Sequence, residues 1–333
     1  MRETRRRLLA APLLLAPFLL AAPALRAQEA FPSRPITIIA AGAAGGPTDT
    51  ITRIVADAMT RTMAQAWGGQ PVVVEAIGGS TVGPQRGALA RPDGYTLLLN
   101  NIGFAASATL YRKLPYNVLE SFAPLGLVSD AAMTLVARPD FPASDLRGYI
   151  AALREGGDKL NLAHAGLGSA AHLCGMLVQQ AAAAQATTVV FRGTGPAIAE
   201  LMAGRIDLLC DQATNTVPFI RDNRVRAYGV TSPARLPALD QLPTTAEAGF
   251  PGIAMSTWHA LYAPAGTPED VQEALSAALR AALKDEKLRQ RFAELATDPA
   301  TEERATIAFH KRFLAEEVAR WRPIIQAAGT FAD

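Results

Sequence analysis

The chain has 333 residues, a formal net charge of +2, four His and two Cys. Half of the residues are apolar and 19% are charged, which is typical of a compact α/β protein. No stripe of Lys and Arg indicates a nucleic-acid partner, and no Cys or His spacing indicates a metal site. We therefore expect neither a metal nor another cofactor.

An export signal is predicted at the N-terminus. Arg5 to Arg7 precede an apolar run from Leu8 to Ala22, and Leu25-Arg-Ala27 offers a small residue for cleavage. The apolar run is shorter than the roughly 20 residues that span a bilayer. Cleavage after Ala27 leaves 306 residues, removes five Arg and one Glu, and changes the net charge from +2 to −2. We expect a periplasmic location, reached by either the general secretory or the twin-arginine route.

Strands and helices alternate in the first part of the mature chain. Strands are predicted at 36–40, 72–75 and 95–100, and helices at 50–66 and after residue 83. Apolar residues recur at helical spacing in 50–66, and Gly68-Gly69 ends that helix. This βαβαβ order predicts a parallel sheet with right-handed crossovers.

The alternation restarts after residue 128. The segments that read as strands are 160–164, 187–191, 206–210 and 225–230, and helices separate them, which indicates a second α/β domain. A further strand starts at Trp258, and three amphipathic helices follow at 269–283, 286–295 and 306–327. A helical tail that returns to the first domain gives two crossovers and a hinge. The predicted division is a signal at 1–27, a discontinuous first domain at 28–128 and 250–333, and a second domain at 129–249.

A glycine loop joins a buried strand to a helix at two places. Residues 36–49 run from a strand through Gly42-Ala-Ala-Gly-Gly46 into a helix, and residues 160–173 repeat this construction through Ala165-Gly-Leu-Gly-Ser169. Free backbone N–H groups at such helix starts attract anions. Two of these loops in one chain predict two domains that grip one small anion.

The two cysteines lie far apart in the sequence. Cys174 falls in a predicted helix and Cys210 at the end of a predicted strand. Their spacing leaves a disulfide open, whereas the burial habit of free cysteines favours two separate buried thiols.

Several short motifs follow one another along the chain. They are Phe31-Pro-Ser-Arg-Pro-Ile36, Gly45-Gly-Pro-Thr-Asp49, Gln70-Pro-Val-Val-Val-Glu75, Arg91-Pro-Asp-Gly-Tyr-Thr-Leu97, Lys113-Leu-Pro-Tyr116, Ser121-Phe-Ala-Pro124, Leu242-Pro-Thr-Thr-Ala-Glu-Ala-Gly249 and Pro264-Ala-Gly-Thr-Pro268. In this order they resemble the Bug family, the solute-binding receptors of tripartite tricarboxylate transporters. The resemblance runs from about Phe31 to Ala332, which is nearly the whole mature chain.

The resemblance implies the α/β fold of a type II periplasmic binding protein, a Venus-flytrap with a ligand cleft between two domains. It implies that the protein captures a small carboxylate or a related small molecule, as a monomer, and delivers it to a membrane transporter. Family members hold the ligand carboxylate through loop backbone groups and bridging waters, which are compatible with tight binding. A sensory receptor with the same fold stays an alternative, because no residue pattern marks the partner-facing surface.

The resemblance also assigns ligand-binding residues. The first loop maps onto Ala43, Ala44, Gly45, Gly46, Pro47, Thr48 and Asp49, and the second onto Gly166, Leu167, Gly168, Ser169, Ala170 and His172. Asn100 and Asn101 end a strand at the edge of the sheet where open α/β sheets collect ligands. Phe191, Arg192 and Asp211 complete the predicted site.

Four of these residues have a second interpretation. Asp49 either accepts a hydrogen bond from the ligand or serves as an acid in the first helical turn. His172 either lies near the ligand or packs its helix, and Arg192 either pairs with a carboxylate or is a solvated surface charge. Asp211, together with Gln212, either faces the cleft or is structural.

Two departures from the family pattern concern the pocket. Many members have Phe-Pro where this chain has Gly42-Ala43, which removes an aromatic wall and predicts a wider pocket. A common Tyr-Lys is replaced by Phe191-Arg192, with the loss of a phenol hydroxyl. The sequence does not choose among dicarboxylates, tricarboxylates, aromatic acids, amino acids and neutral amides as ligands.

Catalytic motifs do not appear in the sequence. The first glycine loop lacks the Lys of a P-loop and the spacing of GxGxxG, and no GxSxG elbow is found. No Ser, His and acid are grouped at a recognised spacing. A binding protein, not an enzyme, is predicted.

Overall fold

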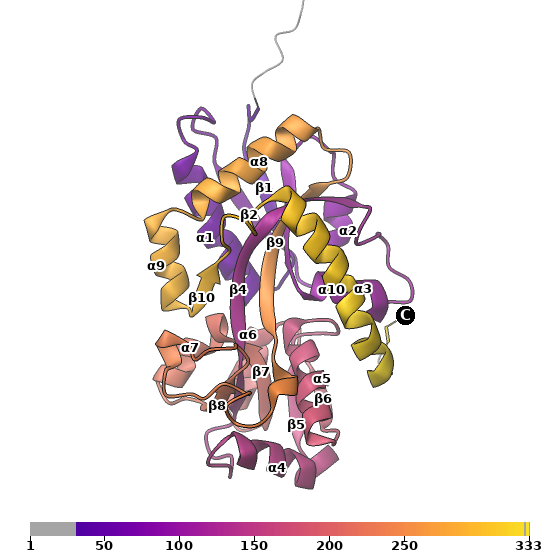
Figure 1. Cartoon of the computed structure of the whole chain (residues 1–333), viewed down its shortest axis with the longest axis vertical. Helices are drawn as coiled ribbons and strands as arrows, with labels where there is room; N and C mark the ends of the chain where they lie inside the picture. The colour runs from indigo at the N-terminus through magenta and orange to yellow at the C-terminus, as the bar shows by residue number, and fades with distance from the viewer. Residues whose placement is uncertain (1–30, 330, 333) are drawn as a thin grey trace, which may run out of the picture. The chain divides into compact units, whose positions relative to one another are not determined.

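A computed structural model describes residues 31–329, 331 and 332, and the expected export signal lies outside them. Residues 31–333 form one compact unit, in which a curled ten-stranded sheet connects two lobes (Figure 1). The strand order along the sheet is β2-β1-β3-β9-β4-β7-β5-β6, with β10 and β8 paired to β4. No helix among the described residues is long and apolar enough to cross a bilayer.

The first lobe contains the predicted parallel βαβαβ unit. Strands β1, β2 and β3 are parallel, and β9 joins β3 in the antiparallel sense. The strands of this lobe are β1 (Ile36–Ala40), β2 (Val72–Ala76), β3 (Thr96–Asn101), β9 (Ser256–Pro264) and β10 (Thr297–Pro299). Its helices are α1 (Pro47–Thr62), α2 (Val82–Ala88), α3 (Gly103–Leu110), α8 (Glu269–Ala282), α9 (Glu286–Glu294) and α10 (Ile307–Ala328).

The second lobe contains a smaller parallel unit. Strand β5 is parallel to β6 and β7, while β7 and β8 are antiparallel to β4. The strands of this lobe are β5 (Asn161–His164), β6 (Thr187–Val190), β7 (Leu208–Gln212) and β8 (Arg226–Val230). Its helices are α4 (Leu146–Gly156), α5 (Ala170–Ala182), α6 (Thr194–Met202) and α7 (Ala213–Arg221).

The long strand β4 (Phe122–Ala137) belongs to both lobes (Figure 1). Its residues up to Ala132 pair with β9, and from Met133 onward it pairs with β7. The expected boundary after residue 128 therefore falls inside a continuous strand. The second connection is the segment that enters β9 at Ser256, which pairs with Ala132. Helices α8, α9 and α10 return to the first lobe, where they contact α1, β4 and α3.

Helix α1 shows how the sequence determines the buried face and the start of a helix that positions the site. Ile51, Val55 and Met59 recur at helical spacing, and all three are fully buried. The helix starts at Pro47, three residues before the predicted start, because proline at the first helical position has no N–H to leave unpaired. The first helical turn is thereby placed directly after the glycine loop.

The two cysteines form a disulfide, so the expectation of two separate thiols was wrong. Cys174 on α5 and Cys210 on β7 have Cα atoms 5.9 Å apart. Both are fully buried, because α5 packs directly on β7. The disulfide ties the helix that follows the second glycine loop to the strand that carries Asp211.

Removing this disulfide should destabilise the second lobe. The bond closes a sequence separation of 36 residues, so the chain-entropy model gives about 4 kcal/mol of stabilisation. We expect Cys174→Ala/Cys210→Ala to lower the free energy of unfolding by about 2–4 kcal/mol, measured by urea denaturation monitored by circular dichroism. An unchanged midpoint under non-reducing conditions would show that the two thiols are not paired.

Candidate functional site

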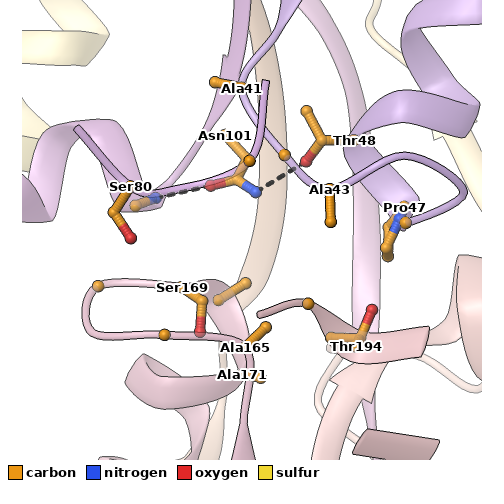
Figure 2. A pocket seen from close by; sticks show the side chains of 18 of the residues that line it. Ala41, Ala43, Pro47, Thr48, Ser80, Asn101, Ala165, Ser169, Ala171 and Thr194 are labelled. Carbon is orange, nitrogen blue, oxygen red and sulfur yellow. Dashed lines mark hydrogen bonds between the residues drawn. The ribbon is translucent and has the colours of Figure 1, made fainter. Parts of the chain in front are cut away.

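A cavity of about 760 Å³ lies between the two lobes. Figure 2 shows loops of the first lobe and of the second lobe facing each other across it. The volume lies within the range of small-molecule sites. The cavity is lined by Ala41, Gly42, Ala43, Gly46, Pro47, Thr48, Gly78, Gly79, Ser80, Asn100, Asn101, Gly103, Ala165, Gly166, Gly168, Ser169, Ala170, Ala171, Val190, Phe191, Arg192, Gly193, Thr194, Asp211 and Gln212.

Within residues 31–329, five helices begin at this cavity. The lining includes the N-cap or first residues of α1, α3, α5, α6 and α7. Each helix start leaves backbone N–H groups unpaired and carries a partial positive charge. Their convergence makes the cavity favourable for an anion, even though the chain has almost no net charge.

The two glycine loops use some of their own N–H groups internally. The N–H of Gly45 donates to the Asp49 carboxylate at 2.8 Å. In the second loop the N–H groups of Gly166 and Gly168 donate to Nδ1 of His164 and of His172, at 3.1 and 3.2 Å. These donors hold the loops in shape and are not available to a ligand.

Other N–H groups at the cavity remain unpaired within the described part of the chain. They belong to Thr48 in the first turn of α1 and to Ala170 and Ala171 in the first turn of α5. The loop 78–80 adds further N–H groups of this kind. A carboxylate between the lobes therefore meets backbone donors from both sides.

Polar side chains of the first lobe form a small hydrogen-bond network at the cavity. Asn101 Nδ2 donates to Thr48 Oγ1 at 3.1 Å, and Asn101 Oδ1 accepts from the Gly103 N–H at 3.0 Å (Figure 2). Asn100 Oδ1 accepts from the Asn101 N–H. This network ties α1, β3 and α3 together at the cavity wall.

The second lobe instead presents buried polar groups that lack partners. Within the described residues, Gln212 Oε1 and Thr194 Oγ1 are buried and make no hydrogen bond of good geometry. Gln212 is 4% exposed and Thr194 is 6% exposed. Both residues line the cavity, beside the buried Asp211.

Asp211 is held at the end of β7 by two donors. The Gln212 N–H donates to Oδ1 at 2.8 Å, and Asn215 Nδ2 donates to Oδ2 at 2.6 Å. Burial raises the pKa of Asp211 to about 7, while the hydrogen bonds from Asn215 and from the Gln212 N–H lower it. Arg192 is the other charged residue of the lining, and its side chain is exposed.

Contacts between the lobes close the cavity. Ser80 Oγ donates to the Leu167 carbonyl at 2.8 Å, and Tyr111 Oη donates to the same oxygen at 3.2 Å. Gly103 lies so near the Gly168 carbonyl that an added Cβ would stand 2.3 Å from its oxygen. The two lobes are therefore closed on each other in this structure.

Thirteen of the predicted site residues line the cavity, and five do not. The lining residues are Ala43, Gly46, Pro47, Thr48, Asn100, Asn101, Gly166, Gly168, Ser169, Ala170, Phe191, Arg192 and Asp211. The others are Ala44, Gly45, Asp49, Leu167 and His172. Ala44 and Gly45 lie on the exposed outer side of the loop.

Asp49 and His172 stabilise the loops from behind. The Asp49 carboxylate accepts from the Gly45 N–H and pairs with Arg53 at 3.0 Å, so it acts as the acid of the first turn. The His172 ring accepts from Gly168 and lies 4.7 Å from the His164 ring. Burial, and then the neighbouring His164, lower the pKa of His172 to about 4, which keeps its Nδ1 available as an acceptor.

Sequence reasoning missed several lining residues. The loop 78–80 and Gly103 contact the opposite lobe, and Thr194 lies beside Asp211. The sequence Gly78-Gly-Ser80 after a strand was a usable signal, because it resembles the other two glycine loops. Gly103 and Thr194 had no such signal.

Comparison with known proteins places the chain in a family. The model of the tripartite tricarboxylate transporter family receptor matches residues 51–330. The chain belongs to the Bug family of these receptors. A protein of Agrobacterium vitis from the TAR-I ttuE-ttuC' intergenic region is 42% identical over 306 residues, which are 91% of this chain and 87% of that protein.

Two solved structures resemble this receptor closely. The periplasmic binding protein BugD has 38% identity and a TM-score of 0.86, and the match covers 91% of this chain and 100% of BugD. MatC from Rhodopseudomonas palustris with bound malate has 35% identity and a TM-score of 0.83, over 89% and 100% of the two chains. The expected two-domain periplasmic-binding-protein fold is confirmed.

Gly103→Ala should weaken ligand binding mainly by opposing closure of the lobes. The new methyl group would collide with the Gly168 carbonyl of the opposite lobe. The backbone itself accepts alanine, because Gly103 does not have a positive φ. Overpacking of this kind costs about 1–3 kcal/mol, so we expect roughly 10- to 100-fold weaker affinity by calorimetry, with a faster off-rate.

The matched control is Gly195→Ala, because Gly195 also lies in the first turn of a helix and its added Cβ would contact nothing within 4 Å. We expect it to leave affinity unchanged. Equal affinity for Gly103→Ala and the control would contradict a closed, ligand-bound state with this lobe contact.

Proposed function

We propose that this receptor captures a small carboxylate in the cavity between its lobes and delivers it to a membrane transporter of the tripartite tricarboxylate type. The convergence of five helix N-termini, with unpaired N–H groups of Thr48, Ala170 and Ala171 in two of them, carries the proposal. MatC, a relative of the same fold, is solved with bound malate. The proposal includes a periplasmic location and a monomeric receptor.

The proposal also holds that the site binds its ligand without chemical change. The Ser80 hydroxyl donates to the Leu167 carbonyl, and the Ser169 hydroxyl accepts from the His172 N–H as a helix cap. No His lines the cavity among the described residues. Neither serine therefore has an adjacent base to activate it.

In this proposal, closure of the lobes around the ligand strengthens ligand binding. A carboxylate at one helix start gains roughly 0.3–1 kcal/mol from the dipole when exposed to water, and up to about 2 kcal/mol when partly buried. The contacts through Ser80 and Gly103 hold the two lobes against each other beside the cavity. A ligand that binds the closed arrangement more tightly shifts the receptor towards it. Ligand occupancy is thereby coupled to the shape that a transporter recognises.

Filling the cavity should abolish ligand binding in a folded protein. Gly46→Val places a branched side chain at the N-cap of α1, and Ser169→Tyr places an aromatic ring at the N-cap of α5. The test is the melting temperature of the mature protein with carboxylates, amino acids and neutral amides. A ligand at 100 times its dissociation constant adds about 2.7 kcal/mol, a shift of a few degrees, in the wild type only.

Gly252→Val serves as the control, because its Cβ would point into open space outside the cavity. Ser169→Tyr also loses a cap, so its melting temperature without ligand should fall by the equivalent of about 1 kcal/mol. A full ligand-induced shift in both cavity variants would show that the ligand binds elsewhere.

A further inference from the structure

The hydrogen-bonding groups at the two sides of the cavity differ in kind. Towards Thr48 and Ala170 the cavity offers backbone N–H donors, and the side chains of Thr48 and Asn101 are already bonded to each other. Towards Asp211 the lining also holds acceptor oxygens, the Asp211 carboxylate and the unpaired Gln212 Oε1, beside the start of α6 and the Arg192 side chain. A second carboxylate has no hydrogen to donate to these two acceptors.

Asp211 is set up to accept hydrogen bonds from a ligand. Each of its oxygens accepts one bond from the protein and retains a free lone pair, since the Gln212 N–H and Asn215 Nδ2 approach different oxygens. Both donors favour the ionised form of the carboxylate. An ionised carboxylate and an unpaired amide oxygen, both more than nine-tenths buried, are costly unless a donor reaches them.

Among the described residues, the side chains that contact Asp211 are neutral, so none of them takes the place of a ligand donor by its charge. Thr194 on α6, Asn215 on α7 and Thr134 on β4 are neutral, and Thr134 Oγ1 bonds to the backbone carbonyl of Asp211. Arg192 also lines the cavity, but its side chain is exposed to solvent. His164 and His172 lie behind the second glycine loop and line a separate cavity.

We propose that the ligand of this receptor is a carboxylate that also carries a hydrogen-bond donor, a hydroxyl or an ammonium group, and that Asp211 and Gln212 bind this donor. The proposal rests on the proposed function, because it says which residues bind the part of the same ligand that lies away from the carboxylate. The carboxylate lies at the starts of α1 and α5, and the donor lies against β7. Asp211 thereby selects against acids that lack the donor, such as simple dicarboxylates.

The test uses two series of compounds that differ only in one substituent. Succinate, malate and aspartate share one carbon skeleton, and 3-phenylpropanoate, phenyllactate and phenylalanine share another. We expect calorimetry at pH 8 to show that the hydroxyl or ammonium member of one series binds about 10- to 100-fold more tightly than the member without a donor. The comparison between hydroxyl and ammonium then identifies the donor.

The pH dependence gives a second measurement on the unmodified protein. With a pKa of about 7 in the free receptor, the Asp211 carboxylate is mostly protonated at pH 6 and mostly ionised at pH 8. A donor-bearing ligand needs the ionised form, so its affinity should rise roughly tenfold from pH 6 to pH 8. Asp211→Asn should remove both this rise and the preference for the donor-bearing member.

Asp298→Asn is the matched control. Burial, and then Asp130, raise the pKa of Asp298, but this residue does not line the cavity. We expect the control to keep the pH dependence of the wild type. If carboxylates bind but the donor gives no advantage, and affinity does not rise with pH, the assignment of Asp211 is wrong and the proposed function stands. If no compound of either series binds the wild type, both are overturned.

Discussion

The structure depends on where its helices start. Five helices begin at one cavity, and their unpaired N–H groups provide a positive potential that the net charge of the chain does not reveal. Because these donors are backbone groups, glycine and small residues dominate the lining, and the loops must be held by other contacts. Asp49 does this for the first loop, and His164 and His172 do it for the second.

The sheet explains how two separate loops act on one ligand. Strand β4 passes from one lobe to the other without a break, and β9 runs beside it, so the lobes are joined by a narrow pair of strands. Such a connection allows hinge closure while each lobe stays rigid. In the second lobe the Cys174–Cys210 disulfide fixes α5 to β7, so the donors of α5 and the acceptors of Asp211 move as one body.

The sequence predicted the parts that repeat a local pattern. Hydrophobic spacing and turn residues predicted the strand, glycine loop and helix at residues 36–62 and at 161–182. The family motifs indicated that these loops bind a ligand. Contacts between segments far apart in sequence were not readable. Gly103 against Gly168 and Ser80 against Leu167 depend on the closed arrangement of the lobes. For Asp49 and His172 the sequence left a ligand contact and a structural role open, and their side chains bond to the loops.

The most direct test of this account is a titration of isotope-labelled mature protein with its carboxylate ligand, followed by the NMR shifts of backbone amides. The account predicts the largest downfield shifts at the N–H groups of Thr48, Ala170 and Ala171, because they are unpaired at the cavity. The amides of Gly166 and Gly168 should move less, since His164 and His172 already accept from them. The largest shifts at residues outside the cavity would contradict a carboxylate held at these helix starts.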